Sequence, residues 1–486
     1  MESNLNLAEL FDAKSVAVIG ASSVPGKWGF GILSLLLAKG GRDVYAINKK
    51  GGEVLGVKAY QNLREVPGPI DFAVVVSSAR DTPAAMEDCV CKGVKYAVVI
   101  PGGFAEASEE GARLEREVVE IARRGGIRFI GPNCMGHFDT YSDFFTIPFN
   151  FPIAKGPASM ITQSGNSGIA VFALAWQAGL GFAKYINSGN EADIRFEDFL
   201  EYLGRDDRTK VILGYVEGLR DGRRFLKLAR EITRRKPIVM LKAGRTDDGA
   251  RAARSHSAAL AGSEQASAAA FKQAGVIRVE EVSDLVDAAL ALSTQPLPRG
   301  RRVGLLSMGG GLGVITTDAL RRCGLEMARF SSRTMEKLNS ALSDRWSHGN
   351  PVDPGGEPVV YPCIFAMMED ENVDAVMIVG GVGMVGGLVP LMPTPPAAKA
   401  AYERLMEAAE RQELENLDRL AELRDKYQKP VITASMLRGS IMKGAVSEKL
   451  EQYHLMPYTG PERAAKALAR LAEYSEYLGA ARAAGP

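Results

Sequence analysis

Histidine, tryptophan and cysteine are scarce in this chain of 486 residues, which has four, three and five of them. The histidines are scattered and no two cysteines have the CxxC spacing, so the sequence supports neither a zinc framework nor a secreted disulfide scaffold. We therefore expect no metal site in this chain. A large charge of either sign is also lacking, since the formal net charge is +1. This excludes a polyanion-binding surface as the main function, and nucleic acid is not an expected partner.

The sequence shows no targeting or membrane-spanning segment. The first residues, MESNLNLAELFDAKS, carry acidic side chains and no apolar signal core. Residues 375–393 are uncharged and nearly all apolar, long enough to cross a bilayer, but they contain five glycines and two prolines. We interpret this stretch as a buried strand, AVMIV, followed by a Gly/Pro loop. A cytoplasmic protein without membrane contact is expected.

Short β-branched apolar runs alternate with longer helical patterns along the whole chain, which is typical of βα units and parallel sheets. At roughly 150 residues per domain the length suggests about three domains. We expect domains over residues 1–150, 151–296 and 300–486. The predicted strands are 15–20, 44–48, 72–77, 96–100 and 128–131, then 158–163, 184–189, 211–218, 237–244 and 276–280, then 302–311, 375–381 and 430–435.

We expect a Rossmann-like fold for the first of these domains, because five strands with crossing helices fall within about 130 residues. Residues 397–427 are highly charged and have leucines at helical spacing. We expect a helix that docks on its own domain there, although a partner-binding face is an alternative.

Three segments share one pattern of strand, Gly/Ser turn and helix: VAVIGASS, MITQSGNSG and GLLSMGGGLG. In parallel α/β folds this junction lies at the carboxyl edge of the sheet, where ligands bind. It also presents a helix amino terminus with free N–H groups, which suits an anion. One such junction in each domain suggests a protein that handles phosphate in more than one place.

The first domain carries signals for a phosphorylated ribose. Its first loop, GASSVPGKWGFG, does not match GxGxxG, and Lys27 adds a cation there. NAD-binding domains usually place an acidic residue at the end of the second strand, where this chain has Asn48, Lys49 and Lys50. Ammonium groups at this edge favour coenzyme A or NADP over NAD, and a solvated lysine pair is the alternative.

Later strand ends of the first domain carry Gly, Ser and Asn loops that let a ligand approach the backbone: SSARDTP, PGGFAE and GPNCMG. From these loops we expect Ser77, Gly103, Glu106 and Asn133 to line a cofactor cleft. Cys134 could act as a nucleophile with His137, but a small residue lining the cleft is the expected role.

The second domain offers anion-binding groups in two segments. QSGNSG opens a helix at Ser164, Gly165 and Asn166, and SGNEADI supplies further donors at Ser188, Gly189 and Asn190. We expect these six residues to bind phosphate.

His256 is the most reactive candidate in the chain, since ARSHSAALAG places it among serines and small residues in a long loop. Neutral imidazole is a competent nucleophile for phosphoryl transfer. A charged adduct would need a carboxylate to orient the ring, and Glu217, at the end of a buried strand, can supply one. From these residues alone, phosphohistidine, structural and metal-binding roles all stay open.

The motifs together resemble one family, the α subunits of nucleoside-diphosphate-forming acyl-CoA synthetases, in particular the ADP-forming acetyl-CoA synthetases, relatives of succinyl-CoA ligase. The resemblance covers essentially the whole chain. It rests on GASxxPGKxG, GPNCMG, TQSGNSG, SGNEAD, YVEGxxDGRRF, GRxxxGxxAxxSHxxALAG and NPVDPGG. It implies a CoA-binding Rossmann-like domain followed by two flavodoxin-like domains with parallel sheets.

The resemblance also implies roles for individual residues. His256 would be phosphorylated, Glu217 would steady the phosphohistidine, and the helix starting near Ser164 and Gly165 would point its dipole at the phosphate. A second helix end, at Gly310 and Gly311 in the third domain, would face the same phosphate. Coenzyme A would be held through Gly20, Ser22, Pro25, Lys27, Asn48, Lys49 and Lys50.

Three departures from the family pattern bear on function. Ser257 and Ala258 stand where the family commonly has Thr and Gly, and PGGFAE replaces the usual AGFAE. An ATP-grasp domain is also missing, so the resemblance implies that ADP or ATP and Mg²⁺ bind on a separate ATP-grasp β subunit, with an α₂β₂ assembly. The expected reaction converts a small acyl-CoA, phosphate and ADP into a carboxylic acid, CoA and ATP. The alternatives are a non-catalytic CoA-binding scaffold and an ATP-independent acyl- or carbamoyl-transferring relative.

Overall fold

The computed structural model describes residues 6–249, 251, 264–355, 359–383, 396–435 and 444–483. The chain divides into two compact units. The first comprises Met1–Trp176 with Leu180–Leu285, and the second comprises Val286–Pro486 with Gln177–Gly179. His256, Ser257 and Ala258 lie outside the described residues.

Within its described residues, the first unit contains two seven-stranded sheets. The first sheet has the order β3-β4-β2-β1-β5-β6-β7 and is parallel except for the β3–β4 pair. Without β3 this is the strand order of a classical dinucleotide-binding fold, so the Rossmann-like prediction is confirmed. The strands are β1 (Ser15–Ile19), β2 (Asp43–Ile47), β3 (Gly52–Val54), β4 (Val57–Tyr60), β5 (Phe72–Val75), β6 (Tyr96–Val99) and β7 (Arg128–Ile130).

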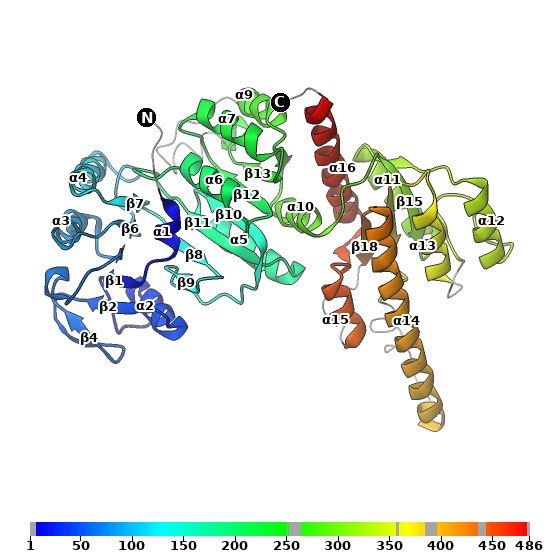
Figure 1. Ribbon diagram of the computed structural model, residues 1–486, viewed down its shortest axis with the longest axis horizontal. Coiled ribbons are helices and arrows are strands. Elements are labelled where there is room, and N and C mark those ends of the chain that lie inside the picture. The colour runs from blue at the N-terminus through cyan, green and yellow to red at the C-terminus, as the bar shows by residue number, and fades with distance from the viewer. Residues whose placement is uncertain are drawn as a thin grey trace. The chain divides into compact units, whose positions relative to one another are not determined.

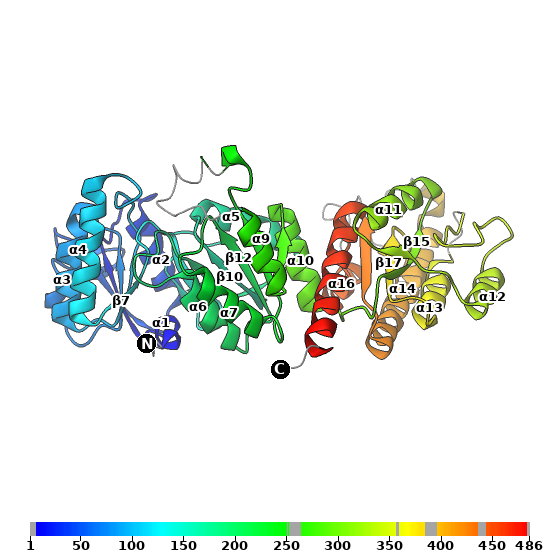
Figure 2. The same cartoon turned by 90° about the horizontal axis from the view of Figure 1, so that it is seen from above.

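Helices cover both faces of the first sheet because its central strands are apolar on both sides; every residue of β1, β5 and β6 is buried. Helices α3 and α4 lie side by side (Figures 1 and 2). The helical segments are α1 (Leu7–Phe11), α2 (Trp28–Lys39), η1 (Leu63–Glu65), η2 (Ala79–Asp81), α3 (Thr82–Lys92) and α4 (Glu109–Gly125).

The second sheet has the order β14-β13-β12-β10-β11-β8-β9. Strands β10 to β14 are parallel in the 2-1-3-4-5 order of flavodoxin-like folds. They are β10 (Lys155–Thr162), β11 (Phe182–Asn187), β12 (Val211–Val216), β13 (Ile238–Lys242) and β14 (Ile277–Val279), with helices α5 (Gly165–Ala178), α6 (Phe196–Arg205), α7 (Gly222–Ile232) and α9 (Glu264–Gln273). The antiparallel edge consists of β8 (Gly136–Asp139) and β9 (Phe144–Phe145).

This edge joins the two halves of the first unit. The chain leaves the first sheet after β7 and enters the second sheet at β8, before the limit of residue 150 that was predicted between the domains. One apolar cluster contains residues of both sheets, such as Val16 and Val18 from β1 with Ile161 and Ile186 from β10 and β11. The first two domains therefore share a core.

The described part of the second unit forms a five-stranded parallel sheet in the order β16-β15-β17-β18-β19, again 2-1-3-4-5. The third, flavodoxin-like domain is thus confirmed. Its strands are β15 (Arg302–Ser307), β16 (Glu326–Met327), β17 (Ala375–Val379), β18 (Val431–Ser435) and β19 (Tyr458–Thr459). Its helices are α11 (Gly310–Arg322), α12 (Ser332–Ala341), α13 (Val360–Glu369), η4 (Pro396–Ala398), α14 (Lys399–Tyr427), α15 (Ala445–Gln452) and α16 (Pro461–Ala483). Helix α10 (Val282–Thr294) begins in the last residues of the first unit and continues into the second.

Helices α11 and α16 pack together within this unit (Figure 2). The expected helix over 397–427 is α14, and its second half docks on its own domain through Leu417, Leu420 and Leu423. The apolar stretch that could have crossed a bilayer begins with the buried strand β17, as predicted. No helix among the described segments combines the length and apolarity that a membrane span requires.

Candidate functional site

A cleft of about 640 Å³ lies in the first unit, where loops from the carboxyl edges of both sheets meet. Its lining comes from the loops after β5, β6 and β7, from the start of α2, and from the ends of β10 and β11. The lining residues are Trp28, Val76, Ser77, Ser78, Ile100, Pro101, Gly102, Glu106, Asn133, Cys134, Met135, Gln163, Ser164, Gly165, Asn166 and Asn187. The structure thus brings together six of the predicted site residues, Ser77, Glu106, Asn133, Ser164, Gly165 and Asn166.

The start of α5 faces this cleft through Ser164, Gly165 and Asn166. A β-carbon at Gly165 would lie 3.0 Å from Met135 Cε and 3.3 Å from Asn187 Oδ1, so a larger residue would crowd the helix end. The amino end of a helix carries partial positive charge and N–H groups. This end of the cleft can therefore hold a phosphate group.

The loop after β1 packs closely against the loop after β5. Gly20 has φ +98°, and a β-carbon there would lie 2.9 Å from Val76 Cγ2. Ser22 Oγ accepts a hydrogen bond from the Val24 N–H at 3.1 Å. Pro25 is exposed, and Lys27 is an exposed residue that immediately precedes α2. This loop presents one cation beside the amino end of a helix.

The second strand ends in a turn tied to this loop. Asn48 donates through Nδ2 to the carbonyl of Ala21 at 2.8 Å and accepts from the Lys50 N–H at 2.9 Å. Lys49 Nζ lies 2.8 Å from Asp81 Oδ1, and the lysine side chain is 82% exposed. The hydrogen bond from Lys49 lowers the pKa of Asp81. The cation expected to meet a ribose phosphate is therefore held by a carboxylate at the same edge of the sheet.

Other predicted ligand-binding residues join the two domains to each other. The Glu106 carboxylate accepts from the Gly103 N–H at 2.6 Å and from Asn190 Nδ2 at 2.6 Å. Asn133 Nδ2 donates to Asn190 Oδ1 at 3.2 Å. Gly189 has φ +57°, and a β-carbon there would lie 2.3 Å from the Pro132 carbonyl oxygen. These loops shape the cleft by holding its two sides together.

Glu217 follows β12 directly and is 7% exposed. Its N–H donates to Gln163 Oε1 at 2.6 Å, and its carbonyl accepts from Lys242 Nζ at 2.7 Å. Because Gln163 also lines the cleft, the Glu217 peptide is coupled to the wall beside the α5 start. The loop with His256 lies outside the described residues, so the predicted pairing with Glu217 stays a prediction.

Comparison with known proteins identifies the chain. A CoA binding domain model matches residues 14–138, and a succinyl-CoA ligase like flavodoxin domain model matches residues 155–292. The α subunits of ADP-forming acetate–CoA ligases II and I from Pyrococcus furiosus are both 40% identical; the matches cover 76% and 72% of this chain and 81% and 77% of those chains. The chain belongs to the family of these α subunits.

A solved structure supports the assignment over nearly the full length. The dinucleotide-forming acetyl-coenzyme A synthetase 1 of Ca. Korarchaeum cryptofilum, in complex with phosphate and ADP, superposes with a TM-score of 0.83 at 29% identity, covering 99% of each chain. The resemblance predicted from the motifs, and with it the assignment to the acid–thiol ligases, is confirmed. The residues that carry this chemistry remain predictions.

In this α subunit, Gly310 and Gly311 stand at the start of α11, after Gly309 with φ +116°. A β-carbon at Gly310 would lie 3.5 Å from Asp353 Oδ2. A carboxylate near the amino end of a helix is favourable. The third-domain helix end therefore already has an anionic neighbour of its own, from the NPVD segment.

A Cys–His pair is absent from the described part of the α subunit. The Cys134 thiol donates to the Val99 carbonyl at 3.4 Å, and burial raises its pKa to about 12. The His137 ring lies between Phe72 and Phe144, its Nδ1 is 3.0 Å from Thr146 Oγ1, and burial lowers its pKa to about 3. Cys134 is a small cleft-lining residue and His137 belongs to the core.

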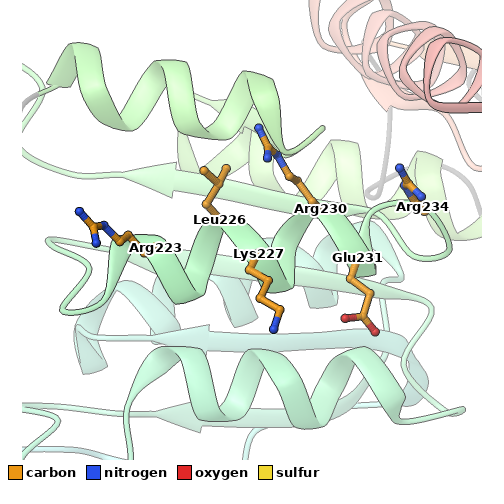
Figure 3. Close-up of a pocket in the computed structure, with 6 residues that line it drawn as sticks. All are labelled: Arg223, Leu226, Lys227, Arg230, Glu231 and Arg234. Atoms are coloured by element: carbon orange, nitrogen blue, oxygen red, sulfur yellow. The ribbon is translucent and has the colours of Figure 1, made fainter. Parts of the chain in front are cut away.

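A second hollow lies on α7 of the α subunit and is lined by Arg223, Leu226, Lys227, Arg230, Glu231 and Arg234. Figure 3 shows that these side chains come from one helix and its end and spread in different directions. Arg230 Nη2 donates to Gln273 Oε1 at 3.0 Å. The side chains that line this hollow therefore do not converge on a common point where a ligand could bind.

Sequence reasoning missed three residues that organise the cleft: Gln163, Asn187 and Glu191. Asn187 accepts from the Met135 N–H at 2.5 Å and donates to the Thr162 carbonyl at 2.8 Å, which ties the loop after β7 to the second sheet. Gln163 and Glu191 were visible only as members of the TQSGNSG and SGNEAD motifs. Their partners are far away in the sequence, so the motifs alone gave no sign of these contacts.

Proposed function

We propose that this α subunit, together with a separate ATP-grasp β subunit, interconverts acyl-CoA, phosphate and ADP with a carboxylic acid, CoA and ATP. The observation that carries the proposal is the cleft, where loops of the CoA-binding domain meet the start of α5. CoA would lie along the first-domain loops, and phosphate would bind at the helix end. The β subunit would carry the nucleotide and Mg²⁺, and the assembly would be α₂β₂.

The first step joins phosphate to the acyl group. A phosphate oxygen forms a bond to the thioester carbonyl carbon, the C–S bond breaks, and CoA leaves as a thiolate that takes up a proton. The helix end formed by Ser164, Gly165 and Asn166 offsets the negative charge of the phosphate and of the acyl phosphate product.

The second step passes the phosphoryl group to His256. An imidazole nitrogen forms the P–N bond, the P–O bond to the acyl group breaks, and the carboxylate leaves. Glu217 would hold the other ring nitrogen, and its backbone is already fixed on both sides by Gln163 and Lys242. The loop then carries the phosphohistidine to the β subunit, where an ADP oxygen takes the phosphoryl group and the P–N bond breaks.

The test uses the α subunit reconstituted with its β subunit. Acetyl-, isobutyryl- and phenylacetyl-CoA are supplied with phosphate and ADP, and loss of thioester and formation of ATP are followed together. With at least one of the three thioesters, the amount of thioester lost should equal the amount of ATP formed. The E217Q variant should lower both amounts. Thioester loss without ADP would indicate an ATP-independent transferase, and CoA binding without turnover would indicate a scaffold.

A further inference from the structure

The side-chain amide of Gln163 holds the peptide that carries Glu217 in one orientation. Its Oε1 accepts from the N–H groups of Glu217 at 2.6 Å and of Gly218 at 3.2 Å. Its Nε2 donates to the Gly218 carbonyl at 2.7 Å and to Glu191 Oε1 at 3.1 Å. Reversing the amide would put the NH₂ group against two N–H donors and the oxygen against two acceptors, so all of these bonds would be lost together.

Glu191 fixes the donor side of this amide. Its Oε1 accepts from Ser188 Oγ at 2.8 Å as well as from Gln163, and the residue is 2% exposed. Glu191 has φ +55°, a backbone conformation that is uncommon for a residue with a side chain. Its second carboxyl oxygen, Oε2, is buried and makes no hydrogen bond within the described residues. A buried carboxyl in a strained backbone is costly, so a compensating role is expected.

The two residues differ in how they meet the cleft. Gln163 is one of the lining residues, whereas Glu191 does not belong to the described set that lines it. An effect of Glu191 on the reaction must therefore pass through its neighbours. Lys242 supports the same peptide from the opposite side, through its bond to the Glu217 carbonyl.

We propose that Gln163 and Glu191 are positioning residues for the phosphoryl-transfer step: the Glu191 carboxylate fixes the orientation of the Gln163 amide, and the amide fixes the peptide that carries Glu217. This inference rests on the proposed function, because it assumes that Glu217 acts on the phosphohistidine. Neither residue forms or breaks a bond with the substrate.

The coupling has a pH dependence that a purely structural contact lacks. Burial raises the pKa of Glu191 to about 7, while the hydrogen bonds from Ser188 and Gln163 oppose this shift. The described charged groups that act on it are Glu197, which raises the pKa, and Arg220, which lowers it. Above pH 7 the anionic carboxylate binds the Gln163 amide strongly, and below pH 7 the neutral acid binds it weakly. Phosphoryl transfer should therefore slow as the pH falls through this range.

The test follows phosphorylation of His256 by labelled ATP and Mg²⁺ in the reconstituted complex. Gln163→Glu keeps the shape and the acceptor but loses the donor, so its oxygen would face the Gly218 carbonyl and Glu191. We expect phosphorylation to slow about 100-fold, the loss typical of a misplaced catalytic group. The KM for CoA should stay within about threefold of the wild-type value, because the first-domain loops are untouched.

A reciprocal exchange separates positioning from general damage. In the double variant Q163E/E191Q the new amide at position 191 can donate to the new carboxylate at position 163. Phosphorylation should therefore be roughly tenfold faster in the double variant than in Q163E. E191Q alone should phosphorylate His256 at every pH at the slow rate that the wild type shows well below pH 7, because its neutral amide binds Gln163 as weakly as the protonated acid does. Should Q163E fail to fold, the pH profile of E191Q decides the question.

Gln295 provides a matched control in the other unit. Its amide also clamps backbone, donating to the His454 carbonyl at 2.9 Å and accepting from the Val431 N–H at 3.1 Å. Q295E should lower the melting temperature without changing phosphorylation by more than about threefold. Wild-type rates in Q163E, or an E191Q pH profile identical to that of the wild type, would overturn the inference. Absence of label in the wild-type complex would instead overturn the proposed function.

Discussion

Replacing Gly189 by alanine should weaken the joint between the first two domains. Gly189 lies in the loop after β11 with φ +57°, and an added β-carbon would lie 2.3 Å from the Pro132 carbonyl oxygen and 2.5 Å from the Asn133 carbonyl oxygen. Both neighbours are backbone atoms, so neither can rotate away. The loop that contains them must move instead, and that loop also lines the cleft through Asn133.

The size of the effect follows from two contributions. The left-handed conformation costs alanine about 1 kcal/mol relative to glycine. Crowding against a packed backbone adds roughly 1–3 kcal/mol. The sum, about 2–4 kcal/mol, corresponds to a fall of roughly 4–16 °C in the melting temperature of a unit of this size.

Gly126 is the matched control, since it has φ +70° and no heavy atom within 4 Å of an added β-carbon. G126A should therefore show only the conformational cost, a fall of about 2–4 °C. Scanning calorimetry of both variants, with the wild type beside them, measures the difference. Equal falls in the two variants would refute the argument that a β-carbon at residue 189 crowds the first-domain loop.

Three further predictions concern the cleft and the groups around it. Asp81→Asn frees the Lys49 ammonium from a surface ion pair worth about 0.5–1 kcal/mol. The KM for CoA should therefore fall roughly two- to fivefold, and a rise in this KM would contradict the assignment of this edge to CoA. Lys242→Met removes the donor to the Glu217 carbonyl, and phosphorylation of His256 should slow while binding of CoA, measured by calorimetry, is unchanged. Cys134→Ser should keep turnover within about threefold of wild type, because the raised pKa leaves the thiol protonated; inactivation would restore the nucleophile hypothesis.

The architecture was predictable wherever strands are apolar and paired in parallel. The runs at β1, β5 and β6 are buried on both faces, so their composition marks them clearly. The hairpin of β3 and β4 was missed because it is short, glycine-containing and partly exposed. Strands β8 and β9 were also missed, because they form the short antiparallel edge of the second sheet and have little periodicity of their own.

The cleft was predictable in its outline and not in its internal contacts. Glycine, serine and asparagine after parallel strands point to the carboxyl edge, which is where Ser77, Asn133 and Gly165 lie. Which of these side chains bond to other protein groups, and which face the ligand, depends on contacts between segments that are distant in the sequence. Asn190 illustrates the point: its amide donates to Glu106 from the first domain, a contact that the sequence does not reveal, and its binding of phosphate stays a prediction.

Phosphorylation of His256 is the central claim, and one measurement tests it most directly. The complex of α and β subunits is incubated with ATP labelled at the γ-phosphate and with Mg²⁺, then quenched and separated by gel electrophoresis. We predict an acid-labile, base-stable label on the α subunit that disappears on addition of ADP and is absent in His256→Ala. A label that persists in His256→Ala would contradict the account.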